Sequence, residues 1–151
     1  MDRRKFLGMG AVAAAAVLAP TTSLMAKDFR AEKPDAWKAV DSKSAIAALY
    51  GAEAADTTDI KVKAPKLAEN GGSIPVNIKS SLDLESIAVF QDANPRSTVA
   101  VFTVPEGGII NYDFRMKMRK TSNVTVVAKT RDGKLLKVVT PVEVSIGGCG
   151  G

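Results

Sequence analysis

The sequence predicts an all-β protein: an immunoglobulin-like antiparallel β-sandwich with a short N-terminal helix and a flexible C-terminal arm. Two observations support this prediction. From Ile60 onward, short runs of residues alternate between apolar and polar side chains, as strands with one buried face do. Turn-forming residues separate these runs at regular intervals. Many short strands between regular turns are typical of a sandwich of two sheets.

Eight segments fit the strand pattern. They are residues 60–64, 73–79, 86–91, 98–104, 110–118, 123–130, 134–139 and 142–146. The turns between them contain Asn70-Gly71-Gly72, Asn94-Pro95, Pro105-Glu106-Gly107-Gly108, Asp132-Gly133 and Pro141. The strongest local signal is Asp132-Gly133, because this dipeptide between two alternating runs favours a tight hairpin.

Residues 27–59 differ in pattern and are predicted to lead into a single sandwich domain at 60–146. Residues 27–38 are charged and contain Pro34, so we expect an extended or loosely ordered segment. Residues 41–49 predict a short helix, which Asp41 or Ser42 would cap and Gly51 would end. Trp37 is expected to pack near this helix. Residues 52–59 are small and polar, as in a linker.

The segment from Tyr112 to Lys120 has one apolar and one basic face. Its apolar positions are Tyr112, Phe114, Met116 and Met118, and its basic positions are Arg115, Lys117, Arg119 and Lys120. We interpret the basic side as a solvated strand face and keep an anion-binding role as the alternative. Phe90, Val101 and Phe102 are further candidates for core or interface. Val101 and Phe102 should lie on opposite faces of their strand, which leaves one of them able to meet a partner.

Residues 1–26 are predicted to be a twin-arginine-type signal peptide. Arg3-Arg4 precede Phe6 and Leu7, as in the twin-arginine export motif, although Gly8 departs from it. The apolar run at 7–18 is shorter than the roughly 20 residues that a membrane-spanning helix needs. We therefore expect export to the periplasm without stable membrane insertion. An ordinary secretory signal and an uncleaved anchor are the alternatives.

Residues 147–151 carry the only cysteine of the chain. Cys149 lies among Gly147, Gly148, Gly150 and Gly151, beyond the last apolar residue. Glycine populates many backbone conformations, so we predict a thin, flexible arm that presents an exposed thiol. The chain has no histidine to activate this thiol. The arrangement is suited to a carrier whose cargo other proteins attach and process, and we predict no catalytic residues.

Composition narrows the possible functions further. One cysteine and no histidine exclude a Cys/His zinc site, and we predict neither a metal nor another cofactor. Outside residues 1–26 there are 18 basic and 15 acidic side chains, a net formal charge of +3. This excess is too small to indicate nucleic-acid binding.

Several motifs of the chain resemble the SoxY family, the sulfur-carrier subunits of the Sox thiosulfate-oxidising system. The matching stretches are Ala64-Pro65, Ala68-Glu69-Asn70-Gly71, Ile74-Pro75-Val76, Asn94-Pro95, Phe114-Arg115-Met116-Lys117-Met118, Asp132-Gly133-Lys134 and Val144-Ser145-Ile146-Gly147-Gly148-Cys149-Gly150-Gly151. The terminal Gly-Gly-Cys-Gly-Gly is the most specific of them. Met116 stands where the family often has isoleucine, which is a conservative change.

The resemblance implies a mechanism and a set of partners. Cys149 would be the covalent attachment site for sulfur, and the four glycines at 147, 148, 150 and 151 would form a swinging arm. A SoxZ-like subunit would complete a heterodimer. A SoxXA-like haem enzyme would load thiosulfate as a cysteine S-thiosulfonate, and a SoxB-like hydrolase would release sulfate. A sulfane dehydrogenase, where present, would oxidise the remaining sulfur.

Two other functions remain as alternatives. Ubiquitin-like sulfur carriers also end in Gly-Gly, but their carboxylate is activated with cytoplasmic ATP, which the export signal argues against. The second alternative is an exported immunoglobulin-like binding or structural subunit without a carrier role.

Overall fold

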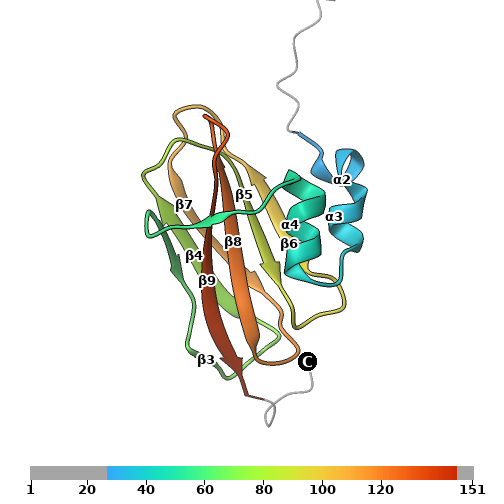
Figure 1. Ribbon diagram of the computed structural model, residues 1–151. Helices are drawn as coiled ribbons and strands as arrows, with labels where there is room; N and C mark the ends of the chain where they lie inside the picture. Colours follow the sequence, from blue (N-terminus) through green and yellow to red (C-terminus); the bar gives the residue numbers. More distant parts are fainter. Residues whose placement is uncertain (1–26, 146–151) are drawn as a thin grey trace, which may run out of the picture.

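The computed structural model describes residues 27–145, which form two β-sheets packed face to face with a helical layer on one side (Figure 1). The larger sheet has the order β1-β9-β8-β5-β6, with β3 also paired to β9. Its strands are β1 (Ala55–Asp56), β3 (Leu67–Ala68), β5 (Leu84–Gln91), β6 (Thr98–Thr103), β8 (Ser122–Thr130) and β9 (Leu135–Val144). The smaller sheet has the order β2-β4-β7, with strands β2 (Ile60–Lys63), β4 (Ile74–Ser80) and β7 (Ile110–Met116). The predicted β-sandwich is confirmed.

The predicted hairpin around Asp132-Gly133 is confirmed as β8 and β9. The two strands pair antiparallel, and Lys129 lies opposite Leu135 next to the turn. Gly133 has a φ of 92°, a left-handed conformation that glycine adopts without steric cost. A hydrogen bond from the Thr130 hydroxyl lowers the pKa of Asp132 below its usual value, so the ionised carboxylate helps to hold the turn.

The predicted turn at Pro141 is wrong, because β9 continues through this residue. Proline cannot donate a backbone hydrogen bond, so it needs a position where one side of the strand is unpaired. Such a position exists at Pro141. It lies opposite Asn123 of β8, whereas β1 pairs with β9 only at Leu136 and Lys137 and β3 only at Glu143 and Val144.

The predicted short helix is confirmed as α4 (Ser42–Tyr50). The Asp41 side chain accepts a hydrogen bond from the backbone N–H of Ser44 at 2.8 Å, and this bond is the main reason that the pKa of Asp41 is lowered. Gly51 ends the helix with a φ of 72°. Both terminal signals in the sequence therefore act as expected.

The prediction of an extended segment at 27–38 is wrong, because this segment forms α2 (Phe29–Glu32) and α3 (Pro34–Lys38). Pro34 occupies the first turn of α3, where the missing N–H costs nothing. Tertiary packing completes the stabilisation, since Ala36 is fully buried against the larger sheet. Trp37 lies in the same cluster as α4, as expected, with the Arg30 guanidinium 4.5 Å from the centroid of its ring.

Two hydrophobic clusters hold the layers together. The main core lies between the sheets, where Ile74, Ile87 and Val124 are fully buried. The second cluster joins α3 and α4 to the outer face of the larger sheet through Ala45, Phe90 and others. Strand β5 is therefore buried on both faces, which explains its nearly unbroken apolar sequence.

The three candidate core or interface residues divide between these clusters: Phe90 and Val101 belong to the second cluster and Phe102 to the main core. Phe90 is fully buried beneath the helices. Val101 is partly buried against the helical layer, whereas Phe102 packs into the main core from the opposite face of β6. The expected opposite orientation is confirmed. Within residues 27–145, no helix has the length and apolar character needed to cross a membrane.

Candidate functional site

The predicted attachment residue Cys149 and the arm glycines Gly147, Gly148, Gly150 and Gly151 lie outside the described residues. The export residues Arg3 and Arg4 also lie outside them. The structure does describe the place where the chain leaves the sandwich toward Cys149, at Val144, the last residue of β9, and at Ser145, which follows it. This end of β9 is the candidate site.

The last residues of β9 are hydrogen-bonded on both sides. The short strand β3 runs parallel to them, and the N–H groups of Glu143 and Ser145 donate to the carbonyls of Lys66 and Ala68 at 2.8 and 3.0 Å. On the other side, the N–H of Val144 donates to the Thr121 hydroxyl at 2.9 Å. The segment that precedes the cysteine therefore starts from a fixed point.

Three segments approach one another closely at Gly71: the turn after β3, the loop at Met118 and the end of β9 at Val144. A Cβ atom at Gly71 would lie 2.5 Å from the carbonyl oxygen of Met118 and 2.8 Å from Cγ1 of Val144. Both distances are too short for any real side chain. The N–H of Met118 also donates to the carbonyl of Gly71 at 2.8 Å. The glycine in the Asn70-Gly71-Gly72 turn thus has a packing role besides its role in the turn.

Asn94 fixes the neighbouring loop between β7 and β8. Its Nδ2 donates to the carbonyl of Lys117 at 2.7 Å, and its Oδ1 accepts from the N–H of Arg119 at 3.0 Å. Asn94 is itself positioned by the buried amide of Gln91, whose Oε1 accepts from the Asn94 N–H at 2.8 Å. This loop carries Thr121, so Asn94 supports the end of β9 indirectly.

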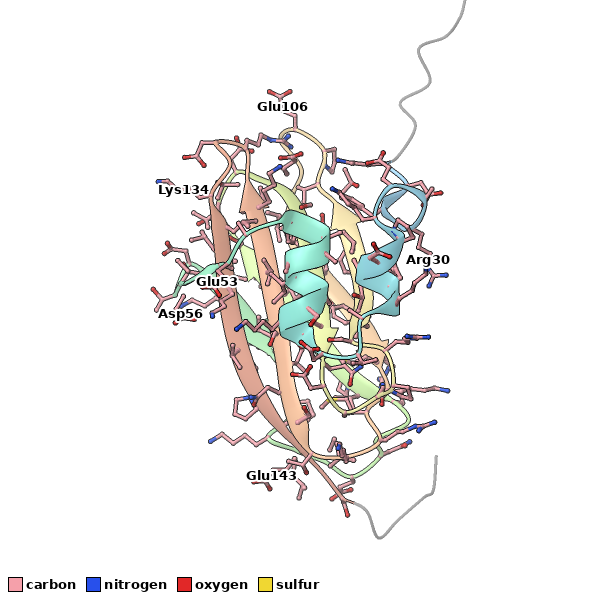
Figure 2. All side chains as sticks on the ribbon, turned by 45° about the vertical axis from the view of Figure 1, so that its right-hand side comes forward. Arg30, Glu53, Asp56, Glu106, Lys134 and Glu143 are labelled. Atoms are coloured by element: carbon pink, nitrogen blue, oxygen red, sulfur yellow. The ribbon has the colours of Figure 1, made fainter. Side chains whose placement is uncertain are left out.

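The segments around the end of β9 are rich in cations. Lys66 precedes β3, and Lys117, Arg119 and Lys120 lie on the loop that leads to Thr121. All four are exposed, and none forms an ion pair with another described residue. Exposed acidic residues here are Glu69 and Glu143. Figure 2 shows Glu143 at this end of the molecule and Lys134, which directly precedes β9, near the opposite end. The local excess of positive charge favours an anionic group on the chain that leaves here.

The predicted basic face is present as an exposed set of side chains. Arg115, Lys117, Arg119 and Lys120 are exposed, while Met116 and Met118 are buried. The Arg115 guanidinium makes a hydrogen bond of 3.3 Å to the Ser73 hydroxyl. The alternation predicted for this segment is confirmed, and it divides the strand into a core face and a solvent face.

Groups with shifted pKa values lie elsewhere in the molecule. Burial raises the pKa of Tyr50 to about 12, and its hydroxyl forms a hydrogen bond of 2.9 Å with the Ser86 hydroxyl. Asp41 caps α4, and Asp132 lies at the opposite end of β9 from Val144. Residues 27–145 contain no cluster of three His, Cys, Asp or Glu side chains that could hold a metal ion.

Sequence reasoning missed three residues that build the site. The sequence marks Gly71 and Asn94 as turn residues within family-like motifs, without a role in the site, and does not mark Thr121 at all. Their motifs, Asn70-Gly71-Gly72 and Asn94-Pro95, were the available signals. These motifs reveal a turn, but they do not reveal that two turns and a threonine meet beneath the end of another strand.

Comparisons with known proteins place this architecture among sulfur oxidation proteins. A family model described as "Sulfur oxidation protein SoxY" matches residues 46–149. The structure of the sulfur carrier protein SoxY from Chlorobium limicola f thiosulfatophilum is 38% identical, with a TM-score of 0.62. The match covers 69% of this chain and 96% of that one.

More distant structures share only the fold. A superoxide reductase (neelaredoxin) from Ignicoccus hospitalis is 13% identical, with a TM-score of 0.53 over 59% of this chain and 82% of that one. Among curated proteins no match was found. The match to the SoxY family model covers more than half of the sequence, and it extends from α4 through the sandwich to the position of the only cysteine. This chain therefore belongs to the SoxY family of sulfur oxidation proteins.

Proposed function

We propose that this protein is the covalent sulfur carrier of a periplasmic thiosulfate-oxidising system, and that Cys149 holds the cargo. The observation that carries the proposal is the family match, which reaches residue 149, together with 38% identity to a SoxY described as a sulfur carrier protein. The second candidate, a binding subunit without a carrier role, does not account for a lone cysteine between glycine pairs.

The geometry at the end of β9 supports a tethered carrier. Hydrogen bonds from Glu143, Val144 and Ser145 keep the departure point of the arm fixed relative to the sandwich. From Ser145 to Cys149, a fully extended chain spans at most about 14 Å. A short tether of this kind keeps the cargo at a high effective concentration for any enzyme docked beside the domain.

The proposed reaction cycle needs no catalytic group on this chain. In the loading step, the Cys149 thiolate and thiosulfate form a sulfur–sulfur bond and lose two electrons to a SoxXA-like haem enzyme. The product is a cysteine S-thiosulfonate with one negative charge. A SoxB-like hydrolase then adds water across the bond to the sulfonate group, releasing hydrogen sulfate and leaving a cysteine persulfide. A sulfane dehydrogenase, where the host has one, oxidises the persulfide sulfur.

The charges of this end of the molecule are suited to that cargo. The S-thiosulfonate is an anion, and Lys66, Lys117, Arg119 and Lys120 provide unpaired positive charge near the start of the arm. We further propose export through Arg3 and Arg4 by the twin-arginine route. A SoxZ-like subunit would bind in the cytoplasm, so that the folded heterodimer crosses the membrane together.

The test is the intact mass of the protein recovered without reductant from cells oxidising thiosulfate. We expect mass increases that correspond to a sulfane or thiosulfonate adduct on the wild-type protein, and no adduct on Cys149→Ser. Peptide mapping should place the adduct on the C-terminal peptide. An unmodified wild-type protein, or normal thiosulfate oxidation by a Cys149→Ser strain, would favour the binding subunit instead. Loss of cargo only after deletion of Gly151 would favour a thiocarboxylate carrier.

A further inference from the structure

The outer face of the smaller sheet is uncovered within residues 27–145. The helical layer packs on the larger sheet, and its hydrophobic cluster contains no residue of β2, β4 or β7 (Figure 1). The side chains that point outward from the smaller sheet are those of Lys61, Lys63, Pro75, Asn77, Lys79, Asn111, Asp113 and Arg115. Four of these eight are cations and only Asp113 is an anion, so this face is basic.

One end of this face is hollowed. The hollow has a volume of about 510 Å³, and its lining includes Lys63, Pro65, Pro75, Asn77, Asp113 and Arg115. The carboxylate of Asp113 accepts a hydrogen bond from Nδ2 of Asn77 at 2.8 Å. Neither Lys63 nor Arg115 forms an ion pair with another described residue, so both charges are available to a binding partner.

The hollow lies beside the end of β9, from which the arm departs. Lys63 is three residues before Lys66, whose carbonyl accepts a hydrogen bond from β9 at 2.8 Å. Arg115 is three residues before Met118, whose N–H donates to the carbonyl of Gly71 beneath β9. Three residues span at most about 10 Å of chain. Both cations of the hollow are therefore close to the base of the arm.

The length of the arm limits where a processing enzyme can bind. Cys149 can lie at most about 14 Å from Ser145, even when the chain between them is fully extended. An enzyme that takes the Cys149 sulfur into its active site must therefore contact the domain around the end of β9. The hollowed end of the smaller sheet borders this point and offers an uncovered surface for that contact.

The charges of this surface select an acidic partner. Complementary potentials speed the encounter of two proteins, whereas like potentials oppose it. A second copy of this chain would bring the same basic face and would be repelled. A small free anion would meet the carboxylate of Asp113 in the same hollow. An extended acidic surface can contact Lys63 and Arg115 while Asp113 keeps its hydrogen bond with Asn77.

We propose that the hollowed end of the smaller sheet, with Lys63 and Arg115, is the docking surface for the hydrolase that processes the Cys149 adduct, through an acidic rim around its active-site entrance. This inference rests on the carrier function proposed above. Docking beside the base of the arm places the active site within reach of the short tether. The two cations act chiefly on the rate of encounter, as exposed charges at the rim of an interface do.

The test measures hydrolysis of a carrier that is loaded without an enzyme. The Cys149 thiolate attacks a sulfane sulfur of tetrathionate, which forms the S-thiosulfonate and releases thiosulfate with the electron pair of the broken sulfur–sulfur bond. A SoxB-like hydrolase then releases sulfate from this carrier, used together with its SoxZ-like subunit. Lys63→Glu and Arg115→Glu should each raise KM by about fivefold or more at low salt with kcat unchanged, because they weaken binding and not the chemical step.

Salt dependence and a matched variant make the test specific. Added NaCl should raise KM steeply for the parent and less for the two sheet variants, because salt screens exposed charges. Lys43→Glu makes the same charge change at an exposed position of α4, over the larger sheet, and should leave KM unchanged. Alkylation of Cys149 by iodoacetamide should proceed at the same rate in all variants, which separates docking from an effect on the thiol.

The outcomes distinguish this proposal from the carrier function. An unchanged KM in both sheet variants, or an equal rise in Lys43→Glu, would overturn the docking surface alone. A hydrolase that cannot use the loaded parent would overturn the carrier function and the docking surface together. Sheet variants that lose the SoxZ-like subunit during size-exclusion chromatography would assign this face to that subunit. Calorimetric binding of thiosulfate that Lys63→Glu abolishes would assign the hollow to a free anion, and either result would overturn the proposal.

Discussion

The hydroxyl pair of Tyr50 and Ser86 shows how single residues join the helical layer to the sandwich. The Tyr50 hydroxyl lies 2.9 Å from the Ser86 hydroxyl, and Ser86 is only 2% exposed. A buried polar group is costly unless it has a hydrogen-bond partner. Burial favours the neutral phenol and raises its pKa from 10.0 to about 12. The Ser86 hydroxyl acts in the opposite direction, because it can donate to a phenolate, so burial is the cause of the raised pKa.

Tyr50→Phe should lower the free energy of unfolding at pH 7 by about 1 kcal/mol, because Ser86 loses its partner. The variant should also change the alkaline stability profile. The pKa of the folded state lies above that of the unfolded state, so the stabilisation from neutral Tyr50 is complete below about pH 10 and is lost as the pH rises through about 12. Urea unfolding across this range should show a shallower decline for Tyr50→Phe. Equal slopes for the two proteins would contradict this assignment.

At the scale of elements, the end of β9 depends on pieces from two distant loops. The loop after β3 contributes Gly71, and the loop before β8 contributes Thr121. Together they satisfy the N–H of Val144 and bring the backbone of Met118 against Gly71. The stability of the arm's departure point is thus a property of the whole arrangement.

Thr121→Val should loosen the end of β9, while the volume of the side chain at position 121 stays nearly the same. The N–H of Val144 loses its acceptor, which we expect to cost about 1–3 kcal/mol of stability. Thr121→Ser keeps the hydroxyl and is the matched control. Hydrogen exchange should accelerate at Val144 in Thr121→Val and stay near the parent rate in Thr121→Ser. Unchanged protection in both would show that the hydroxyl does not hold the strand.

Gly71→Ala should strain the same region from the other side. Its added methyl group would overlap the carbonyl oxygen of Met118 and the side chain of Val144, and such overpacking costs about 1–3 kcal/mol. Gly72→Ala serves as the comparison, because a Cβ there approaches only the flexible side chain of Asn70, at 3.1 Å. Thermal unfolding should give a clearly larger loss for Gly71→Ala. A larger loss at Gly72 would argue against the close packing described here.

For the whole molecule, the two hydrophobic clusters share strand β5. One face of β5 contributes Ile87 to the core between the sheets, and the other contributes Phe90 to the helical layer. Helices α3 and α4 thus cover part of the outer face of the larger sheet (Figure 1). The helices are part of the folded unit, since the sheet face beneath them is apolar.

Phe90→Ala should uncouple the two layers. Removing a fully buried aromatic side chain is expected to cost about 3–5 kcal/mol. Because Phe90 belongs to the helical cluster, we also expect the substitution to accelerate hydrogen exchange, relative to the parent protein, more in α4 than in β4 of the smaller sheet. Hydrogen exchange with mass spectrometry measures both. Equal acceleration in α4 and β4 would indicate that the molecule opens only as a single unit.

Features that depend on neighbouring residues can be predicted from the sequence. Period-two alternation predicts the main strands, Asp132-Gly133 predicts the β8–β9 hairpin, and Asp41 with Gly51 delimits α4. Each of these signals acts over a few bonds, so it can be read locally. The lone Cys149 among glycines is also a local feature, and its role as the attachment site remains a prediction.

Features that join distant residues depend on the folded structure. It turned the segment at 27–38 into two helices, because packing on β5 and its neighbours compensates for weak local preference. It placed Pro141 inside β9, because one side of the strand is unpaired there. It also brought Gly71, Asn94 and Thr121 together beneath the end of β9. Such contacts depend on where separate segments meet in space, and no local pattern in the sequence encodes that position.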